Sequence, residues 1–368
     1  MSGCAPGCCR GHSKLLVPLA AVLGLAALPG GGRGDSAIKR TKSQVEALIR
    51  KAGATPPTWW DSVKLDYPAT LDLTWDQKNG LHDETRNTSL YLWWVCYPNP
   101  GRWKPGVKLL HHLLQVNQRD PGALRKTMAA LGSMYHDLLQ DYARAAFWWR
   151  KAGSATEIQP KLAHCYWKLG SKAMAAATLS LLGSDDTQDG SVIKAWADLG
   201  ELGKALKLAR EKARRAPEVA YLAAGDACRK AGKYDDAVAY YEKVLRVPES
   251  SARQKQSKLN KQRAQANLTA VRVFDALNLN RLPDGTYAGS SLGYAGALEV
   301  SVTVRGHRLT SVKVTKHEDK QFFCALNDTP RRIVARQGVK GVDAVSGATM
   351  TSEAILNATA KALATAME

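Results

Sequence analysis

The stretch that decides the fold, residues 221–248, reads YLAAGDACRKAGKYDDAVAYYEKVLRVP. Two runs of helical character meet at the turn around Gly232, and Pro248 ends the second run because proline cannot continue a helix. The small residues Gly225 and Ala237 let two helices approach closely, and Tyr241 fills the space between neighbouring units. The segment therefore predicts a pair of closely packed helices.

The same pattern recurs upstream at a nearly constant interval. Alanines separated by 30, 30 and 32 residues mark four copies: Ala145, Ala175, Ala205 and Ala237. A residue nine or ten positions earlier recurs with them (Tyr135, Tyr166, Trp196 and Cys228), and the first copy carries one extra residue in its turn. A period of this length is typical of stacked helical repeats, and the units resemble the tetratricopeptide repeat. We predict an all-α solenoid over residues 119–250, with the four alanines at equivalent helix contacts.

The segments on either side of the repeats have their own composition. Residues 36–118 include six tryptophans among Pro and Gly, which predict an irregular cap over the exposed end of the solenoid and an incomplete repeat from about Tyr91. An aromatic ligand groove is the alternative. Residues 251–281 form a basic segment with helical spacing, expected to close the solenoid and to link it to the next domain. Its charges are expected to face solvent.

The N-terminal segment predicts that the protein is exported, and the charge distribution indicates the kind of partner that it binds. Residues 1–35 resemble a signal peptide with a linker: basic residues precede the 14-residue apolar run Leu15–Leu28, which is short for a membrane span. An uncleaved anchor is the alternative. The chain has a net charge of +19, of which residues 1–35 and 282–368 carry only +2 each. Because export argues against nucleic acid, an acidic partner protein or a membrane surface is the expected complement of this charge.

The cysteines exclude two kinds of site. Four of them lie beyond the signal segment, at Cys96, Cys165, Cys228 and Cys324, and no Cys-x-x-Cys spacing occurs. Neither a zinc ribbon nor a c-type haem is indicated. The four are either buried thiols or partners in one or two disulfides.

Residues 282–368 follow a different pattern. Leu298–Val304 and Leu309–Val314 alternate in polarity around a turn at residues 305–308, which predicts a β-hairpin. Helices are expected at Asp328–Gln337 and Ser352–Met367. These elements predict a small α+β domain after the solenoid.

A hydroxyl-rich turn precedes the last expected helix. Residues 343–352 read DAVSGATMTS. The free N–H groups and the dipole at a helix N-terminus form a site suited to phosphate. The alternative is structural, with Thr351 or Ser352 serving only as a helix cap.

Residues 283–363 resemble the FMN-binding domain of flavin subunits in the sodium-pumping NADH:quinone reductase and the Rnf complex. The matching pieces are 284–289, 293–296, 305–309, 314–318 and 343–352. In that family Asp-x-x-Ser/Thr-Gly-Ala-Thr/Ser marks covalent flavinylation by a flavin transferase. The resemblance implies FMN joined through its phosphate to Thr349, and a transferase that recognises Asp343, Ser346, Gly347 and Ala348. It also implies contributions to FMN binding from Thr351, Ser352, Gly293, Tyr294 and Gly296, with Thr351 the main rival attachment residue.

Two functions follow from these patterns. The first is an exported, extracytoplasmic electron-transfer flavoprotein rather than a self-contained catalyst, whose repeats dock a redox partner protein in solution or at the membrane. No Gly-x-Gly-x-x-Gly follows a strand, so no nicotinamide site is indicated. The second is a repeat-based interaction scaffold whose FMN-binding domain is non-redox or binds FMN without a covalent bond.

Overall fold

The computed structural model describes residues 38–75, 86–153, 155–249, 254–274, 276–319, 323–342, 344–345 and 348–367. The elements before the repeats are α1 (Lys42–Ala54), α2 (Thr88–Leu90), the π-helix η1 (Tyr91–Cys96) and α3 (Pro100–Val116). Residues 88–116 are largely helical, which agrees with the incomplete repeat expected from about Tyr91 and not with an irregular cap, and α1 had not been predicted. Trp59, Trp60, Trp75 and Trp103 do pack against the core, but Trp93 and Trp94 are 39% and 48% exposed.

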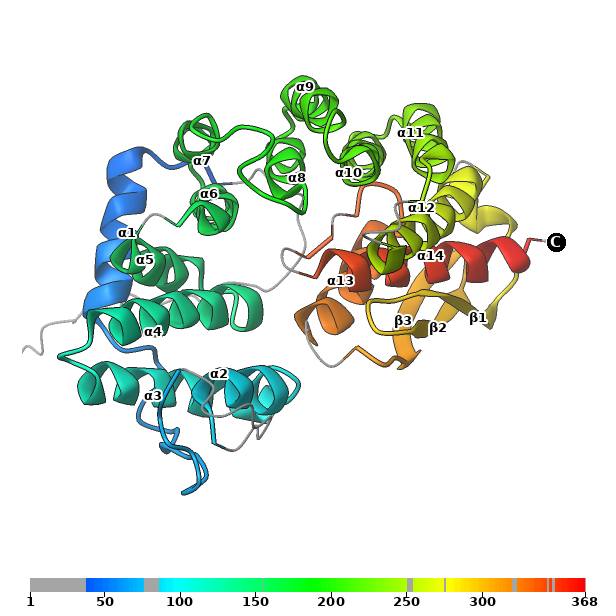
Figure 1. The fold of residues 1–368 in the computed structure, drawn as a ribbon. Helices are drawn as coiled ribbons and strands as arrows, with labels where there is room; N and C mark the ends of the chain where they lie inside the picture. The colour runs from blue at the N-terminus through cyan, green and yellow to red at the C-terminus, as the bar shows by residue number, and fades with distance from the viewer. Residues whose placement is uncertain are drawn as a thin grey trace, which may run out of the picture. The chain divides into compact units, whose positions relative to one another are not determined.

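The repeat region consists of paired helices (Figure 1). Each first helix packs on the helix that follows it in the chain. The elements are α4 (Pro121–Ser133), η2 (Met134–Leu138), α5 (Tyr142–Ala152), η3 (Thr156–Ile158), α6 (Gln159–Lys168), α7 (Lys172–Leu179), α8 (Ser191–Asp198), α9 (Leu202–Lys212), α10 (Pro217–Lys230) and α11 (Tyr234–Arg246). The repeat prediction is confirmed, because all four spaced alanines are completely buried.

Two turn features explain the repeat spacing. Gly170, Gly200 and Gly232 have φ values of 98°, 77° and 72°, a left-handed conformation that favours glycine where one helix ends and the next begins. The extra residue of the first copy is accommodated by η2, a π-helical turn at the end of α4. Ala145 of this copy is accordingly as completely buried as the equivalent alanines of the other three.

An aromatic side chain packs against a glycine in the first and last copies. A Cβ placed on Gly132 would lie 2.3 Å from Trp149, and one on Gly225 would lie 2.5 Å from Tyr241. Both rings are completely or almost completely buried. The absence of a side chain at these glycines is thus a packing requirement of each helix pair.

The C-terminal part contains a three-stranded antiparallel sheet in the order β1-β2-β3. Its elements are α12 (Gln254–Phe274), η5 (Leu279–Arg281), β1 (Gly285–Leu292), β2 (Ala297–Arg305), β3 (Arg308–Lys316), α13 (Phe323–Arg336) and α14 (Thr349–Thr365). The hairpin and both helices were predicted, although α13 begins before Asp328 and α14 begins three residues before Ser352. Strand β1 had not been predicted. Helix α14 packs on β1, where Gly289 allows the contact because a Cβ would lie 2.2 Å from the Ala358 carbonyl oxygen.

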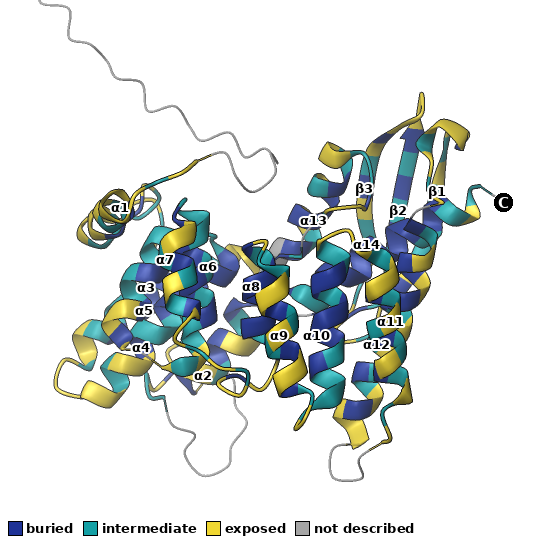
Figure 2. Cartoon of the chain, turned by 90° about the horizontal axis from the view of Figure 1, so that it is seen from above, coloured by how far each residue is buried: buried dark blue, intermediate teal, exposed yellow. Residues whose placement is uncertain are grey.

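Helix α12 joins the repeats to the sheet domain. It packs against α11 and α14 (Figure 1), and the facing sides of α10, α12 and α14 are buried (Figure 2). Leu268, Val271 and Phe274 of α12 belong to one hydrophobic core with Tyr241 of the repeats and Ile355 of α14. The last repeat and the sheet domain therefore share a core instead of being joined by a loose linker.

A buried ionic network crosses the same junction. Glu353 on α14 is 2% exposed and accepts hydrogen bonds from Arg263 of α12 at 2.7 Å and from Arg229 of α10 at 3.1 Å. Asp226 of α10 pairs with Arg263 at 2.6 Å and accepts from the Tyr241 hydroxyl at 2.8 Å. The expectation that the charges of α12 face solvent was wrong for Arg263, since its partners lie on α10 and α14. Lys255, Lys258 and Arg272 are exposed as expected.

The cysteines described by the structure are free. Cys96, Cys165 and Cys228 are buried thiols, and burial raises the pKa of Cys96 to about 12 and that of Cys228 to about 11. The side chain of Cys324 and the apolar run Leu15–Leu28 lie outside the described residues. Among the described helices, none has both the length and the apolar character that crossing a membrane requires.

The close contact at Gly225 gives a stability prediction. Gly225→Leu should lower the free energy of unfolding by about 1–3 kcal/mol, because the new side chain overlaps Tyr241. Urea unfolding followed by circular dichroism measures the change. Gly203→Ala is the matched control, since its Cβ would have no neighbour within 4 Å, and it should be neutral or slightly stabilising. Equal stability of Gly225→Leu and the wild type would contradict the packing.

The ionic network gives a second prediction. Glu353→Gln should lower the free energy of unfolding by about 3–5 kcal/mol near pH 7, because it leaves buried guanidinium charge without its carboxylate. Glu242→Gln is the control, since Glu242 pairs with the exposed Arg246 and Arg272 and should cost less than about 1 kcal/mol.

The same variant has a defined pH dependence. Burial alone would raise the pKa of Glu353, but Arg263 and Arg229 outweigh burial and lower the pKa from 4.5 to about 2. A lowered folded-state pKa stabilises the protein above the unfolded-state value, and that stabilisation is lost as the pH falls through the folded-state value. The difference between wild type and Glu353→Gln should therefore be constant above about pH 5 and shrink towards pH 2. A difference that grows on acidification would refute the assignment.

Candidate functional site

Helix α14 begins at the motif that the sequence singled out. Thr349 is its first residue, and its N-cap is Ala348, whose methyl group cannot cap the helix. The Ala348 N–H donates to the Val345 carbonyl at 2.9 Å, which shapes the approach to the helix. An uncapped helix N-terminus presents N–H groups and a positive dipole end to an anion. Asp343, Ser346 and Gly347 lie outside the described residues.

The next two hydroxyls of the motif are committed to internal hydrogen bonds. Thr351 is 1% exposed and donates to Asp319 Oδ2 at 2.5 Å. Ser352 is completely buried, donates to the Ala348 carbonyl at 2.9 Å and accepts from the Val345 N–H at 3.0 Å. Neither is the N-cap of α14, so the capping alternative was wrong. Thr349, by contrast, is only half-buried.

The turn at residues 293–296 is held against the start of α14. The Gly293 N–H donates to the Gly296 carbonyl at 2.7 Å, and a Cβ on Gly296 would lie 2.6 Å from a Glu318 carboxylate oxygen. Asp319 Oδ1 accepts from the Ala295 N–H at 2.8 Å, while its other oxygen binds Thr351. The buried Asp319 thus connects the turn to the helix, a role that had not been predicted. The sequence signal was only an acidic residue shortly after the third strand.

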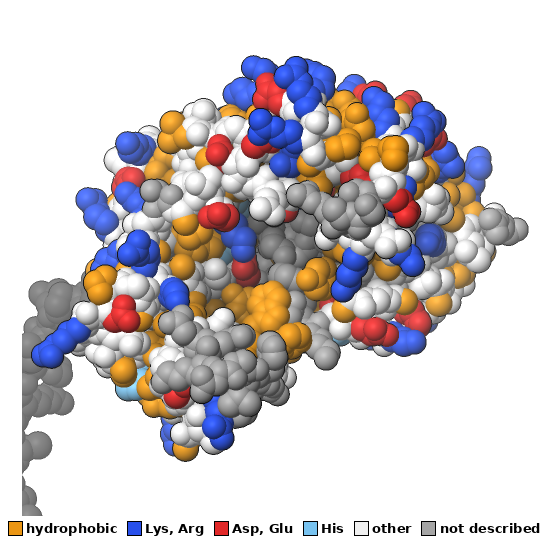
Figure 3. All heavy atoms as spheres, in the orientation of Figure 1, with side chains coloured by type: hydrophobic (Ala, Val, Ile, Leu, Met, Phe, Trp, Pro, Cys, Tyr) orange, Lys and Arg blue, Asp and Glu red, His pale blue; other side chains and the backbone are white. Residues whose placement is uncertain are grey.

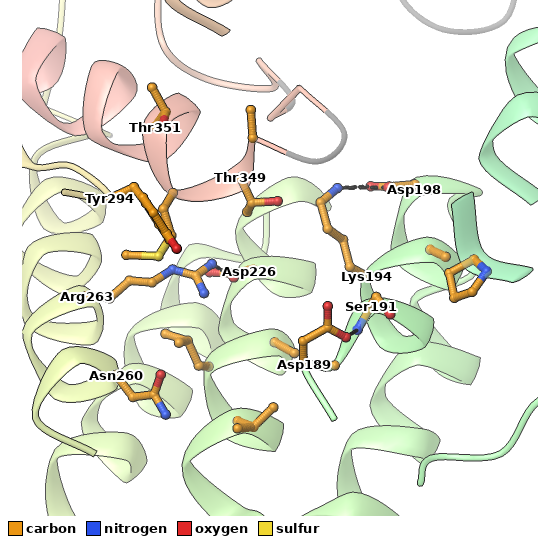
Figure 4. Close-up of a pocket in the computed structure, with 18 of the residues that line it drawn as sticks. Asp189, Ser191, Lys194, Asp198, Asp226, Asn260, Arg263, Tyr294, Thr349 and Thr351 are labelled. Carbon is orange, nitrogen blue, oxygen red and sulfur yellow. Dashed lines mark hydrogen bonds and ion pairs between the residues drawn. The ribbon is translucent and has the colours of Figure 1, made fainter. Parts of the chain in front are cut away.

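Tyr294 and Thr349 lie on the wall of one cavity of about 400 Å³ (Figure 4). Ala348, Met350 and Thr351 complete the side contributed by the sheet domain. The opposite side belongs to the repeats and α12, and includes Asp189, Lys194, Asp198, Leu222, Ala223, Asn260 and Arg263. Of the sequence-predicted residues, the structure therefore gathers Tyr294, Ala348, Thr349 and Thr351 around the cavity. Gly293 and Gly296 form the turn that carries Tyr294, and Ser352 is hydrogen-bonded to the segment before α14. None of these three residues lines the cavity.

The polar groups on the repeat side are paired. Asp198 lies between two cations, with Lys194 Nζ at 2.8 Å and Lys230 Nζ at 2.9 Å. Lys194 lies on α8, and its side chain and that of Thr349 point toward the same space (Figure 4). Two lysines and one carboxylate leave this group with an excess of one positive charge near the first residue of α14.

A pair of imidazoles, the buried His136 and the partly buried His164, adjoins the same cavity. His136 Nδ1 lies 2.6 Å from Asp137, and His136 Nε2 lies 3.0 Å from Nδ1 of His164, which lines the cavity. Burial would raise the pKa of Asp137, but Lys161 and His136 outweigh it and lower the pKa to about 2. Burial, together with His136 and nearby lysines, holds the pKa of His164 well below its usual value. This arrangement had not been predicted, because it brings His136 and Asp137 of η2 against Lys161 and His164 of α6, which are distant in the sequence.

The comparisons with known proteins agree with this geometry. Residues 293–364 match the model of the FMN-binding domain family, and residues 219–250 match a tetratricopeptide repeat. A segment of 84 residues is 38% identical to an uncharacterized protein of Treponema pallidum (strain Nichols). That match covers 22% of this chain and 23% of the relative, so it spans about a quarter of the relative's length. No solved structure matches the chain significantly.

The class of the C-terminal part is therefore established: it is an FMN-binding domain, preceded by a tetratricopeptide repeat. The cofactor of this domain is FMN. The residues present fit that cofactor, since an uncapped helix N-terminus suits its phosphate and a half-buried hydroxyl lies at that terminus. The adjoining cavity is within the range of about 300–1,000 Å³ that holds small ligands. The described residues contain no cluster of three side chains suited to a metal ion.

Proposed function

We propose that this protein is an exported flavoprotein that carries FMN on Thr349 and transfers electrons outside the cytoplasm, with its repeats docking the redox partner. The observation that carries the proposal is the position of Thr349. It is the first residue of α14, it lines the cavity, and it ends the run Asp343-x-x-Ser346-Gly347-Ala348-Thr349. The rival Thr351 is buried and hydrogen-bonded to Asp319.

The residues around Thr349 suit a phosphoester at that position. The hydroxyl supplies the oxygen of the ester, and the N-terminus of α14 stabilises the negative charge of the phosphate. Ala348 leaves space next to the hydroxyl because its side chain is a single methyl group. Bound FMN supplies a centre that accepts two electrons and passes them on singly. A flavin transferase would transfer FMN from FAD to this hydroxyl during maturation, so that the pyrophosphate bond of FAD breaks, the Thr349 hydroxyl loses its proton and AMP leaves.

The exposed basic side chains of the repeats favour a partner with an acidic surface. Lys204, Lys207 and Arg210 are exposed on α9, and Figure 3 shows Lys and Arg side chains gathered over this helix. A cationic face increases the rate of encounter with an acidic surface. We propose an acidic protein, or a protein at an anionic membrane surface, as the redox partner, and no nucleic acid.

Covalent attachment is tested with the transferase present. Wild-type protein coexpressed with the transferase and exported should keep one FMN after denaturation, because a phosphoester does not depend on the fold. Thr349→Ala and Thr349→Val should abolish the label, whereas Thr349→Ser keeps a hydroxyl and should retain part of it. In-gel flavin fluorescence and peptide mapping measure the result. Thr351→Val is the matched control and should remain labelled.

The outcomes separate the competing assignments. A fluorescent band from denatured Thr349→Ala would overturn Thr349 as the attachment residue. Label found on the peptide at Thr351 would identify the rival. A wild type that binds FMN only before denaturation would favour the scaffold whose domain holds FMN without a covalent bond.

Export is tested on the native protein. The apolar run Leu15–Leu28 should be absent from the mature chain, with cleavage between about residue 28 and residue 38. Mass spectrometry of the N-terminal peptide measures this directly. An intact peptide spanning Met1–Gly30 would instead show that the segment is retained as an anchor.

A further inference from the structure

The cavity beside Thr349 has walls from two parts of the chain. The FMN-binding domain contributes Tyr294 and the first turn of α14, and the repeats contribute α8 and α10. A second, smaller hollow nearby is also lined by Thr349, Lys194 and Asp198. The repeats therefore lie across these cavities from the proposed attachment residue, and a group joined there would meet their side chains.

The opposing walls are held at a fixed separation. Glu353 lies one helical turn after Thr349 on α14, and it is bonded to Arg229 of α10 and Arg263 of α12. Arg263 itself lines the cavity and pairs with Asp226. The junction also contains the shared hydrophobic core around α12. The cavity is thus built at an interface that is joined both by buried ion pairs and by a shared apolar core.

The lining has the composition of a ligand pocket. Leu222, Ala223 and Val219 give apolar surface on α10, while Asn260 and the paired charges give polar groups. Tyr294 is 48% exposed and lines the side of the cavity that the FMN-binding domain contributes. Apolar surface with a few convergent polar groups is typical of sites for planar organic cofactors.

We propose that the repeats form one wall of the flavin site, so that the isoalloxazine ring of FMN held on Thr349 occupies this cavity beside Lys194 and Asp198. The inference rests on the proposed attachment at Thr349. It gives the repeats a role in setting the properties of the cofactor, in addition to partner docking. Lys194 and Asp198 would act on the ring electrostatically, through their charges.

The charges predict opposite effects on the midpoint potential. Two electrons and one proton added to the ring leave one negative charge on it, which a nearby cation stabilises and a nearby anion destabilises. Lys194→Gln removes a positive charge and should lower the potential, while Asp198→Asn removes a negative charge and should raise it. Each change should alter the equilibrium between oxidised and reduced flavin about tenfold, which corresponds to about 30 mV for a two-electron couple.

The variants are suited to a comparison in folded protein. After Lys194→Gln, Asp198 keeps Lys230 as its partner, and after Asp198→Asn the two lysines remain about one quarter exposed. Lys204→Gln is the control of equal charge change, because Lys204 lies on α9, is 56% exposed and pairs with Glu201. Its potential should equal that of the wild type. Spectroelectrochemical titration of the labelled protein gives all four values.

A second measurement locates the ring without any substitution. Iodide should quench the flavin fluorescence of the native labelled protein several-fold less than that of the same protein after denaturation, because the cavity restricts access to the ring. Equal quenching in both states, or potentials of Lys194→Gln and Asp198→Asn equal to that of the wild type, would overturn the proposal.

A failure of the proposed position of the ring can be distinguished from a failure of the proposed attachment to Thr349. If the wild type carries no covalent label, the assignment of Thr349 fails, and the same potentials measured with FMN bound non-covalently decide whether the ring occupies the cavity. Opposite shifts there would support the repeat wall without the ester. A protein that binds FMN in neither way would overturn both proposals.

Discussion

The carboxylate of Glu353 is buried between two guanidinium groups, and the arrangement of the two parts of the chain depends on it. Its ion-pair partners come from α10 and α12, while Glu353 itself lies on the helix that carries the proposed flavin site. A buried charge without a partner is strongly destabilising, so α14 cannot move away from the repeats without exposing or stranding these groups. The hydrogen bond between Asn357 and Asn267, at 2.7 Å, extends the same constraint along α14.

This constraint reaches the site through the geometry of one helix. Thr349 and Glu353 are four residues apart, so they lie on the same side of α14, about one turn from each other. Fixing Glu353 against α10 and α12 therefore points the start of α14 toward α8 and α10. The position of Thr349 beside Lys194 is a consequence of ion pairs made one turn away. Asp319 holds the same turn of the helix from the other side through Thr351.

The sequence predicted those features that depend on local spacing. The four alanines could be predicted because a small residue is required wherever two helices cross closely, and that requirement recurs with each repeat. Strand β1 was missed because Gly285, Ala288 and Gly289 give little of the alternation that marks a strand. The start of α14 was placed three residues late because Ala348 is not a capping residue, which leaves the N-terminus free for an anion. Because this helix end has no capping side chain, the sequence contains no capping residue that would mark where α14 begins.

Long-range pairs were beyond prediction for a different reason. Arg263 belongs to a run of basic residues in which each member looks equivalent, and only the partners contributed by α10 and α14 distinguish it. Buried ion pairs contribute little net stability compared with apolar contacts of the same volume, because both charges lose their hydration. Apolar packing along α12 already joins the two parts, so stability alone does not require Glu353 there. The charges add geometric specificity. Two apolar surfaces can slide past each other at little cost, whereas a carboxylate held by two guanidinium groups fixes one register of α14. A cofactor site with walls from two parts of a chain requires that register to be unique.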